Sequence, residues 1–90
     1  MRKLQKLLLS AEACQDLDAI TGTLRIAVVE RLRMLKRFPN MGVLVDETST
    51  VREATVDNFR IFYRVTRRGV EVIFIRHCRR KFPFPKSSNY

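Results

Sequence analysis

The sequence contains few of the residues on which disulfide-rich, metal-binding or cofactor-binding domains depend. It has no tryptophan, one histidine, two cysteines, three glycines and three prolines in 90 residues. Cys14 and Cys78 lie far apart without metal-ligand spacing, so we expect two reduced thiols rather than a disulfide. There is also no glycine-rich phosphate loop and no cluster of metal ligands. We therefore expect no cofactor and no metal.

Long apolar runs are also missing. The first residues, MRKLQK, resemble the charged start of a signal peptide, but the apolar run Leu7–Leu9 that follows is too short. No stretch approaches the roughly 20 apolar residues of a membrane-spanning helix. We expect a soluble, cytoplasmic protein with no membrane partner.

Acidic residues are scarce, at nine against 18 basic ones, which gives a net charge of +9. The excess is uneven, because residues 51–90 carry ten basic and three acidic side chains. Thirteen basic residues are arginine, whose planar guanidinium suits phosphate and carboxylate groups. This charge favours a polyanion or an acidic protein as partner, the alternative being a basic surface that only aids solubility. The apolar fraction of 46% predicts one folded domain over residues 1–90.

The first half of the chain predicts a strand followed by two helices. Residues 4–9 favour a short strand, although a helix fits the same pattern. Ser10 is a good cap for a first helix that stops at Gly22, and Thr23 is expected to cap a second helix that ends at Pro39. With only a turn between them, the helices form an antiparallel hairpin. The expected inward residues are Ala13, Leu17 and Ile20 in the first helix and Leu24, Val28, Leu32 and Leu35 in the second.

The second half predicts a loop and a β-meander. Residues 39–50 are typical of a loop, in which the apolar run Val43–Val45 is expected to pack on the body of the domain. Three segments rich in β-branched and aromatic residues follow and predict antiparallel strands. We expect a two-residue turn at Asp57-Asn58 and a three-residue turn at 67–69; a two-residue second turn would shift the last strand by one residue. The predicted strands are Val51–Val56, Phe59–Thr66 and Val70–His77.

One face of this meander is expected to pack on the helix hairpin, because a half-covered sheet needs one continuous apolar side. On the other face Arg60 and Arg76 lie directly opposite each other, where like charges repel. Two explanations stay open: an anion or acidic partner lies between them, or Glu53 partly neutralises a solvated face. The expected inner face is Ala54, Val56, Phe59, Ile61, Tyr63, Val65, Ile73 and Ile75. The expected outer face is Glu53, Arg60, Phe62, Arg64, Val72, Phe74 and Arg76.

The predicted fold class is therefore α+β. A short N-terminal strand and an antiparallel helix hairpin combine with a mostly antiparallel sheet that ends in a three-stranded meander. The core of the domain covers about residues 4–81. Residues 82–90 form a C-terminal tail, because two prolines near its start disfavour a helix and a central strand.

Five segments, spread over roughly residues 6–81, carry a resemblance to a known family. They are ACQDLDAI (13–20), LKRFPNMG (35–42), VRE (51–53), FRIFYRV (59–65) and IRHCRR (75–80). In their order and spacing they resemble the RelE/ParE superfamily, the toxins of bacterial type II toxin–antitoxin systems, and in particular ParE-like plasmid stabilisation toxins. The predicted order of strands and helices is also that of this superfamily.

The resemblance implies a growth inhibitor that a cognate antitoxin neutralises by wrapping the toxin and covering its basic sheet surface in a hetero-oligomer. It also implies one of two targets. ParE-like members poison DNA gyrase, whereas RelE-like members cleave messenger RNA in the ribosome. An inactive homologue that only binds antitoxin is a third possibility. The residues expected to bind the target or the antitoxin are Arg52, Arg60, Arg64, Arg76, Arg79 and Arg80.

Only the ribonuclease alternative makes the chain an enzyme. Cleavage of RNA needs a base for the ribose 2′-hydroxyl, cations for the phosphate and an acid for the leaving oxygen. His77 is the candidate acid or base, since imidazole exchanges protons near neutral pH. Arg60 and Arg79 are the candidate cations. The other interpretation of His77 is a structural residue at the end of a strand.

Two departures from the RelE pattern favour the ParE-like hypothesis. RelE-like enzymes have lysines in the second strand, and this sequence has none between Lys36 and Lys81. They also have a catalytic tyrosine shortly after the last strand, where this chain has Phe82 and Phe84. Tyr63, the tyrosine of the meander, is expected in the core.

Overall fold

The computed structural model describes residues 6–78, which form one layer of helices and one sheet. The predicted α+β class is confirmed. The elements in chain order are β1 (Lys6–Leu9), α1 (Ala11–Asp18), α2 (Gly22–Arg37), the 3-10 helix η1 (Pro39–Met41), β2 (Val43–Leu44), β3 (Val51–Val56), β4 (Phe59–Thr66) and β5 (Gly69–His77).

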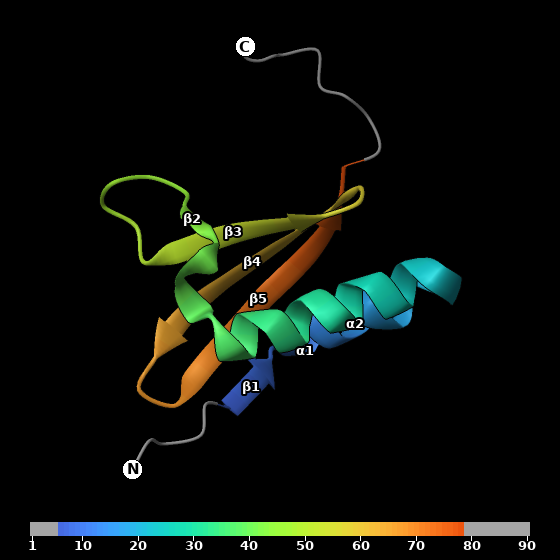
Figure 1. Ribbon diagram of the computed structural model, residues 1–90, viewed down its shortest axis with the longest axis horizontal. Coiled ribbons are helices and arrows are strands. Elements are labelled where there is room, and N and C mark those ends of the chain that lie inside the picture. The colour runs from blue at the N-terminus through green and yellow to red at the C-terminus, as the bar shows by residue number, and fades with distance from the viewer. Residues whose placement is uncertain (1–5, 79–90) are drawn as a thin grey trace.

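The sheet has the strand order β1-β5-β4-β3-β2 (Figure 1). Strands β3, β4 and β5 form the predicted antiparallel meander, and β2 adds to it antiparallel to β3. The N-terminal strand β1 pairs in parallel with β5, so the first and last elements of the described chain lie side by side. The two edges of the sheet are therefore β1 and β2.

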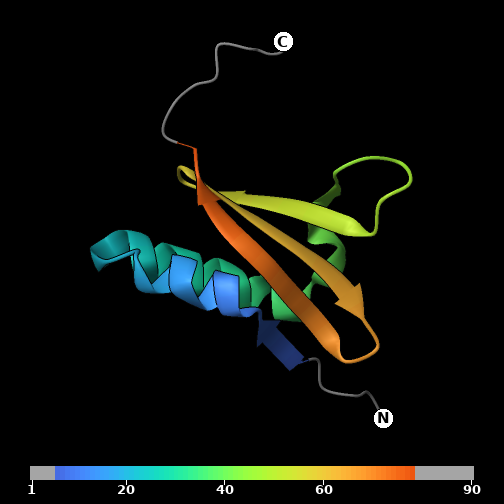
Figure 2. The ribbon, with the colours of Figure 1, turned by 180° about the vertical axis from the view of Figure 1, so that it is seen from behind.

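Both helices lie on the same side of the sheet, as the views from front and back show (Figures 1 and 2). The opposite side, called the outer face below, is not covered by a described element. The core between the helices and the sheet consists of Ala13, Ile20, Val28, Leu32, Leu35, Ala54, Phe59, Ile61, Tyr63, Val70, Val72 and Ile75.

Ser10 caps α1 as predicted and also ties it to the sheet. Its Oγ accepts a hydrogen bond from the backbone N–H of Ala13 at 3.0 Å and donates one to the carbonyl of Ile73 at 2.6 Å. Because β5 continues beyond the end of β1, its edge is then covered by α1. There the carboxylate of Asp16 accepts a hydrogen bond from the N–H of Ile75 at 2.9 Å.

The predicted junction between the helices was wrong in its details. Helix α1 ends at Asp18, and α2 begins at Gly22, with Thr21 rather than Thr23 at the N-cap. Gly22 has a φ of +67°, which glycine adopts more easily than other residues. The glycine is therefore needed where the chain enters α2, and not to end α1. Leu24, expected to point inward, is 42% exposed, because it lies in the first turn of α2.

The hairpin of β4 and β5 has a shorter turn than predicted. Thr66 pairs with Gly69, which leaves the two-residue turn Arg67-Arg68. This shifts the near part of β5, so that Val72 is buried on the helix side and not on the outer face. A bulge opposite Phe62 and Tyr63 then adds one residue to β5 and restores the predicted register beyond it. Ile73, the extra residue of the bulge, is half-buried instead of lying in the core. Val65 also departs from the prediction, since it is 40% exposed.

The apolar run Val43–Val45 does not pack on the body of the domain. Val43 and Leu44 form β2, and the three side chains of the run are 71%, 41% and 42% exposed. The reason is that β2 pairs with β3 at the edge of the sheet, where no described element covers it. The predicted tail, residues 82–90, lies outside the described residues.

Candidate functional site: an arginine face and a separate histidine

Three of the arginines that the sequence singled out lie on the outer face, around an aromatic pair. Arg60 and Arg76 are direct cross-strand partners, as predicted, and Arg64 lies further along β4. Between them the rings of Phe62 and Phe74 pack against each other with a centroid distance of 4.8 Å. The outer face thus combines an apolar centre with cationic flanks, a combination typical of surfaces that bind proteins.

Each of these arginines has a carboxylate partner within the chain. The Nε of Arg60 lies 3.3 Å from Glu53, and the Nε of Arg64 lies 3.6 Å from Glu71. The pair of Arg60 with Glu53 supports the second of the two explanations for the opposed arginines. All of these side chains are 28–47% exposed, so such pairs contribute about 0–1 kcal/mol each and can be exchanged for a partner's carboxylates.

Arg76 is held differently, because it reaches over the edge of β5 to α1. It forms ion pairs with Glu12 and, at 3.0 Å, with Asp16, and its guanidinium lies 4.2 Å from the centre of the Phe74 ring. The hydrogen bond to Glu12 is the main cause that raises the pKa of Arg76, and the charge of Asp16 adds to it. Arg76 therefore joins α1 to the sheet as well as contributing to the outer face.

Arg52 does not share the outer face. It pairs with Tyr63 and so points to the helix side, where it donates a hydrogen bond to the carbonyl of Gly42 at 2.7 Å. The hydroxyl of Tyr63, which is fully buried, accepts from the N–H of Gly42 at 2.9 Å and donates to the carbonyl of Pro39 at 2.7 Å. Burial raises the pKa of Tyr63, although the bond from Gly42 and the charge of Arg52 lower it. Arg52 and Tyr63 thus fasten the chain between α2 and β2, and the prediction of Tyr63 as a core residue is confirmed.

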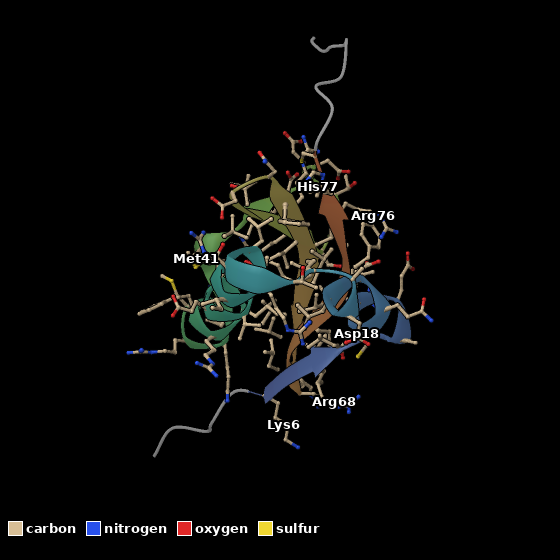
Figure 3. All side chains as sticks on the ribbon, turned by 90° about the vertical axis from the view of Figure 1, so that its right-hand side faces the viewer. Lys6, Asp18, Met41, Arg68, Arg76 and His77 are labelled. Carbon is tan, nitrogen blue, oxygen red and sulfur yellow. The ribbon has the colours of Figure 1, made fainter. Side chains whose placement is uncertain are left out.

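His77 and Arg60 point to opposite faces of the sheet. His77 is the cross-strand partner of Phe59, and their rings meet edge to face with a centroid distance of 4.7 Å. Since successive side chains of a strand alternate, His77 lies on the helix side and Arg76 on the outer side. Figure 3 shows both at the end of β5 that is remote from Lys6 and Arg68. The structure therefore does not bring the candidate acid or base together with the candidate cation Arg60.

The surface around His77 is a shallow hollow of about 380 Å³. The hollow is lined by Asp16, Ala19, Ile20, Phe59, Ile75, Arg76 and His77. Within residues 6–78 no group of three potential metal ligands is found, and no helix is long and apolar enough to cross a membrane. Arg79 and Arg80, two further candidates, lie outside the described residues.

The comparison with known families decides the family of this chain. Residues 7–82 match the model of the ParE toxin of the type II toxin–antitoxin system parDE. The chain belongs to the ParE toxin family. It is thus a toxin of a type II toxin–antitoxin system, and the resemblance noted in the sequence is confirmed. No curated protein shows a significant match to the sequence.

Solved structures show the same fold for this ParE family member. The toxin–antitoxin complex RelBE2 from Mycobacterium tuberculosis contains a chain that is 22% identical, with a TM-score of 0.73 over 83% of this chain and 99% of that one. The isolated RelE toxin of E. coli is 17% identical, with a TM-score of 0.73 over 83% and 85%. The chromosomal ParDE system of P. aeruginosa gives 22% identity and a TM-score of 0.68 over 82% and 96%. At these identities the likeness concerns the fold alone.

The sequence placed Glu53 on the outer face but missed Glu71, the carboxylate partner of Arg64. Glu71 was not assigned to that face because a three-residue turn placed Val72 opposite Arg64. The two-residue turn puts Glu71 there instead. The signal was present, since Glu71 and Arg64 become cross-strand partners as soon as the turn is shortened by one residue.

Proposed function

We propose that this ParE family toxin inhibits bacterial growth by binding DNA gyrase and catalyses no reaction itself. The observation that supports this proposal best is the separation of His77 from Arg60 on opposite faces of the sheet. Acid–base cleavage of RNA needs a proton-transfer group and phosphate-binding cations around one reacting centre. The family match to ParE supports the same proposal, and so does the lack of any lysine between Lys36 and Lys81, where RelE-like enzymes have them.

We further propose that a cognate antitoxin neutralises the toxin by covering the outer face. The solved complexes RelBE2, ParDE and the RelE–RelB complex of Pyrococcus horikoshii OT3 each contain a toxin with its antitoxin. In this chain the pair Phe62 and Phe74 offers an apolar anchor, and Arg60 and Arg64 offer exposed cations. An antitoxin segment with apolar residues flanked by carboxylates would fit both features.

Pulse labelling after induction without antitoxin distinguishes gyrase from the ribosome as the target. We expect DNA synthesis to fall first, within the opening minutes, while protein synthesis continues. The His77→Gln variant should inhibit growth nearly as strongly as the wild type, because His77 packs against Phe59 and faces away from Arg60. If protein synthesis falls first and His77→Gln abolishes toxicity, the ribonuclease alternative holds. Toxin that is soluble and without effect on growth would point to an inactive homologue.

A further inference from the structure

One end of the molecule presents several exposed apolar side chains. They come from the last turn of α2, from η1 and from β2 with the residues beside them, which follow one another in the chain and lie together at one edge of the sheet (Figure 1). Val43 is 71% exposed and Phe38 55%. This group, called the apolar edge below, consists of Met34, Phe38, Met41, Val43, Leu44 and Val45.

The apolar edge also contains backbone groups that can pair with a further strand. In an antiparallel ladder, alternate residues direct their N–H and C=O groups to the same neighbour. The N–H of Val45 donates to the carbonyl of Val51 on β3, so the N–H and C=O of Leu44 point away from β3. Leu44 therefore exposes an open donor and acceptor at the edge of the sheet, which a further strand can pair with.

The charges around β2 suit a second copy of the same strand. If two β2 strands pair antiparallel about Leu44, Asp46 of one copy lies opposite Gly42 of the other. The guanidinium of Arg52 donates a hydrogen bond to the carbonyl of Gly42 at 2.7 Å. The carboxylate of Asp46 in one copy would therefore approach the guanidinium of Arg52 in the other. A hollow of about 450 Å³ is present at this place, lined by Val43, Leu44, Asp46, Glu47 and Arg52.

The placement of the helices is compatible with the same arrangement. A two-fold axis that passes between the two copies of Leu44, perpendicular to the sheet, keeps the helices of both copies on one side of a continuous ten-stranded sheet. Figure 3 places Met41 on the side of the molecule opposite Arg76, so this contact would leave the arginines of the outer face free.

We propose that the free toxin forms a symmetric dimer by edge-to-edge pairing of β2. Two backbone hydrogen bonds and a few apolar side chains make a contact smaller than a standard interface, so we expect weak, concentration-dependent association. The proposal does not depend on gyrase as the target, and it adds a self-association surface to a chain whose antitoxin and target are proposed to bind elsewhere.

Sedimentation equilibrium of the full-length toxin, purified free of antitoxin, tests the proposal. From low micromolar to several hundred micromolar, the average mass of the wild type should rise toward that of a dimer. Leu44→Lys should stay monomeric throughout, because a lysine at the free edge opposes strand pairing. Leu24→Lys is the matched control: Leu24 is 42% exposed against 41% for Leu44, but lies at the far end of α2, and this variant should associate like the wild type.

Circular dichroism establishes that each variant is folded before its mass is compared. A wild type that stays monomeric at the highest concentration overturns the proposal, as does a dimer that Leu44→Lys leaves intact. Hydrogen exchange of the Leu44 amide provides a second measurement. Protection that grows with toxin concentration supports self-pairing, whereas protection only after antitoxin is added assigns the edge to the antitoxin and contradicts the dimer.

Discussion

At the scale of single residues, Tyr63 ties the segment between α2 and β2 to strand β4 through hydrogen bonds with Gly42 and Pro39. Tyr63 was expected in the core from its place in an alternating strand, and it is fully buried. Its bonds to Gly42 and Pro39 could not be predicted, because they depend on how the segment after α2 folds back toward β4. The same holds for Arg52, which looked like a binding residue and holds this segment in place.

Tyr63→Phe should lower the free energy of unfolding by about 1–3 kcal/mol at neutral pH, because it leaves a buried carbonyl and N–H without their partner. Urea unfolding measures this change. A variant as stable as the wild type would show that these two hydrogen bonds contribute nothing.

The stability of the wild type should also fall in alkali more than that of Tyr63→Phe. The pKa of Tyr63 is raised in the folded state, so its contribution is complete below the unfolded value of about 10 and is lost as the pH rises through the folded value. The difference between the two proteins should therefore shrink above about pH 10. A difference that stays constant up to the alkaline limit of folding would contradict the assigned pKa shift.

At the scale of elements, the predicted strands and helices are present, and the errors lie in the connections. The β4–β5 turn has two residues instead of three, and a bulge opposite Phe62 and Tyr63 compensates for it. Sequence patterns repeat every two residues on each side of a bulge, so they show that both halves are strands and not where the extra residue lies. Consequently the pair Arg60–Arg76 was predicted correctly and the pair of Arg64 was not.

The pairing of β1 with β5 requires a glycine at position 69, at the start of β5. Its φ is +136°, and a Cβ atom there would lie 2.3 Å from the carbonyl oxygen of Lys6, which belongs to the paired strand β1. Gly69→Ala should therefore cost about 3 kcal/mol or more and loosen β1, since strain and a backbone clash add. Gly22 also has a positive φ but open space around it, so Gly22→Ala should cost only about 1–2 kcal/mol.

Thermal unfolding of both glycine variants, with hydrogen exchange of the β1 amides, measures these effects. The expected order of stability is wild type, then Gly22→Ala, then Gly69→Ala. Equal losses in the two variants would mean that the close contact between β1 and β5 adds nothing to the conformational strain.

At the scale of the whole molecule, the family and fold followed from the order of the motifs, whereas the distribution of charge among the faces required the structure. The net charge of +9 suggested one basic surface, but the described arginines divide among the outer face, helix α2, the β4–β5 turn and the segment around η1 that Arg52 holds. His77 likewise faces the helix side and not Arg60, whereas Arg76, which precedes it in the sequence, reaches over the edge of β5 and lines the same hollow as His77.

The proposed antitoxin surface predicts a selective loss of binding. Arg60→Ala combined with Arg64→Ala should weaken antitoxin binding about 10- to 100-fold, because two exposed charged contacts of about 1 kcal/mol each are removed. Arg76 is left unchanged because it also holds α1. The control Arg33→Ala with Arg67→Ala has the same net charge and changes exposed residues outside the outer face. Titration calorimetry compares the two; equal affinities would contradict the assigned surface.

The most direct test of the central claim is DNA supercoiling by purified gyrase in the presence of this toxin. We expect the wild type and His77→Gln to inhibit supercoiling to a similar extent, and antitoxin to restore it. Gyrase that stays fully active, together with messenger RNA cleaved on ribosomes by the wild type and not by His77→Gln, would show that the toxin is a ribonuclease and not a gyrase inhibitor.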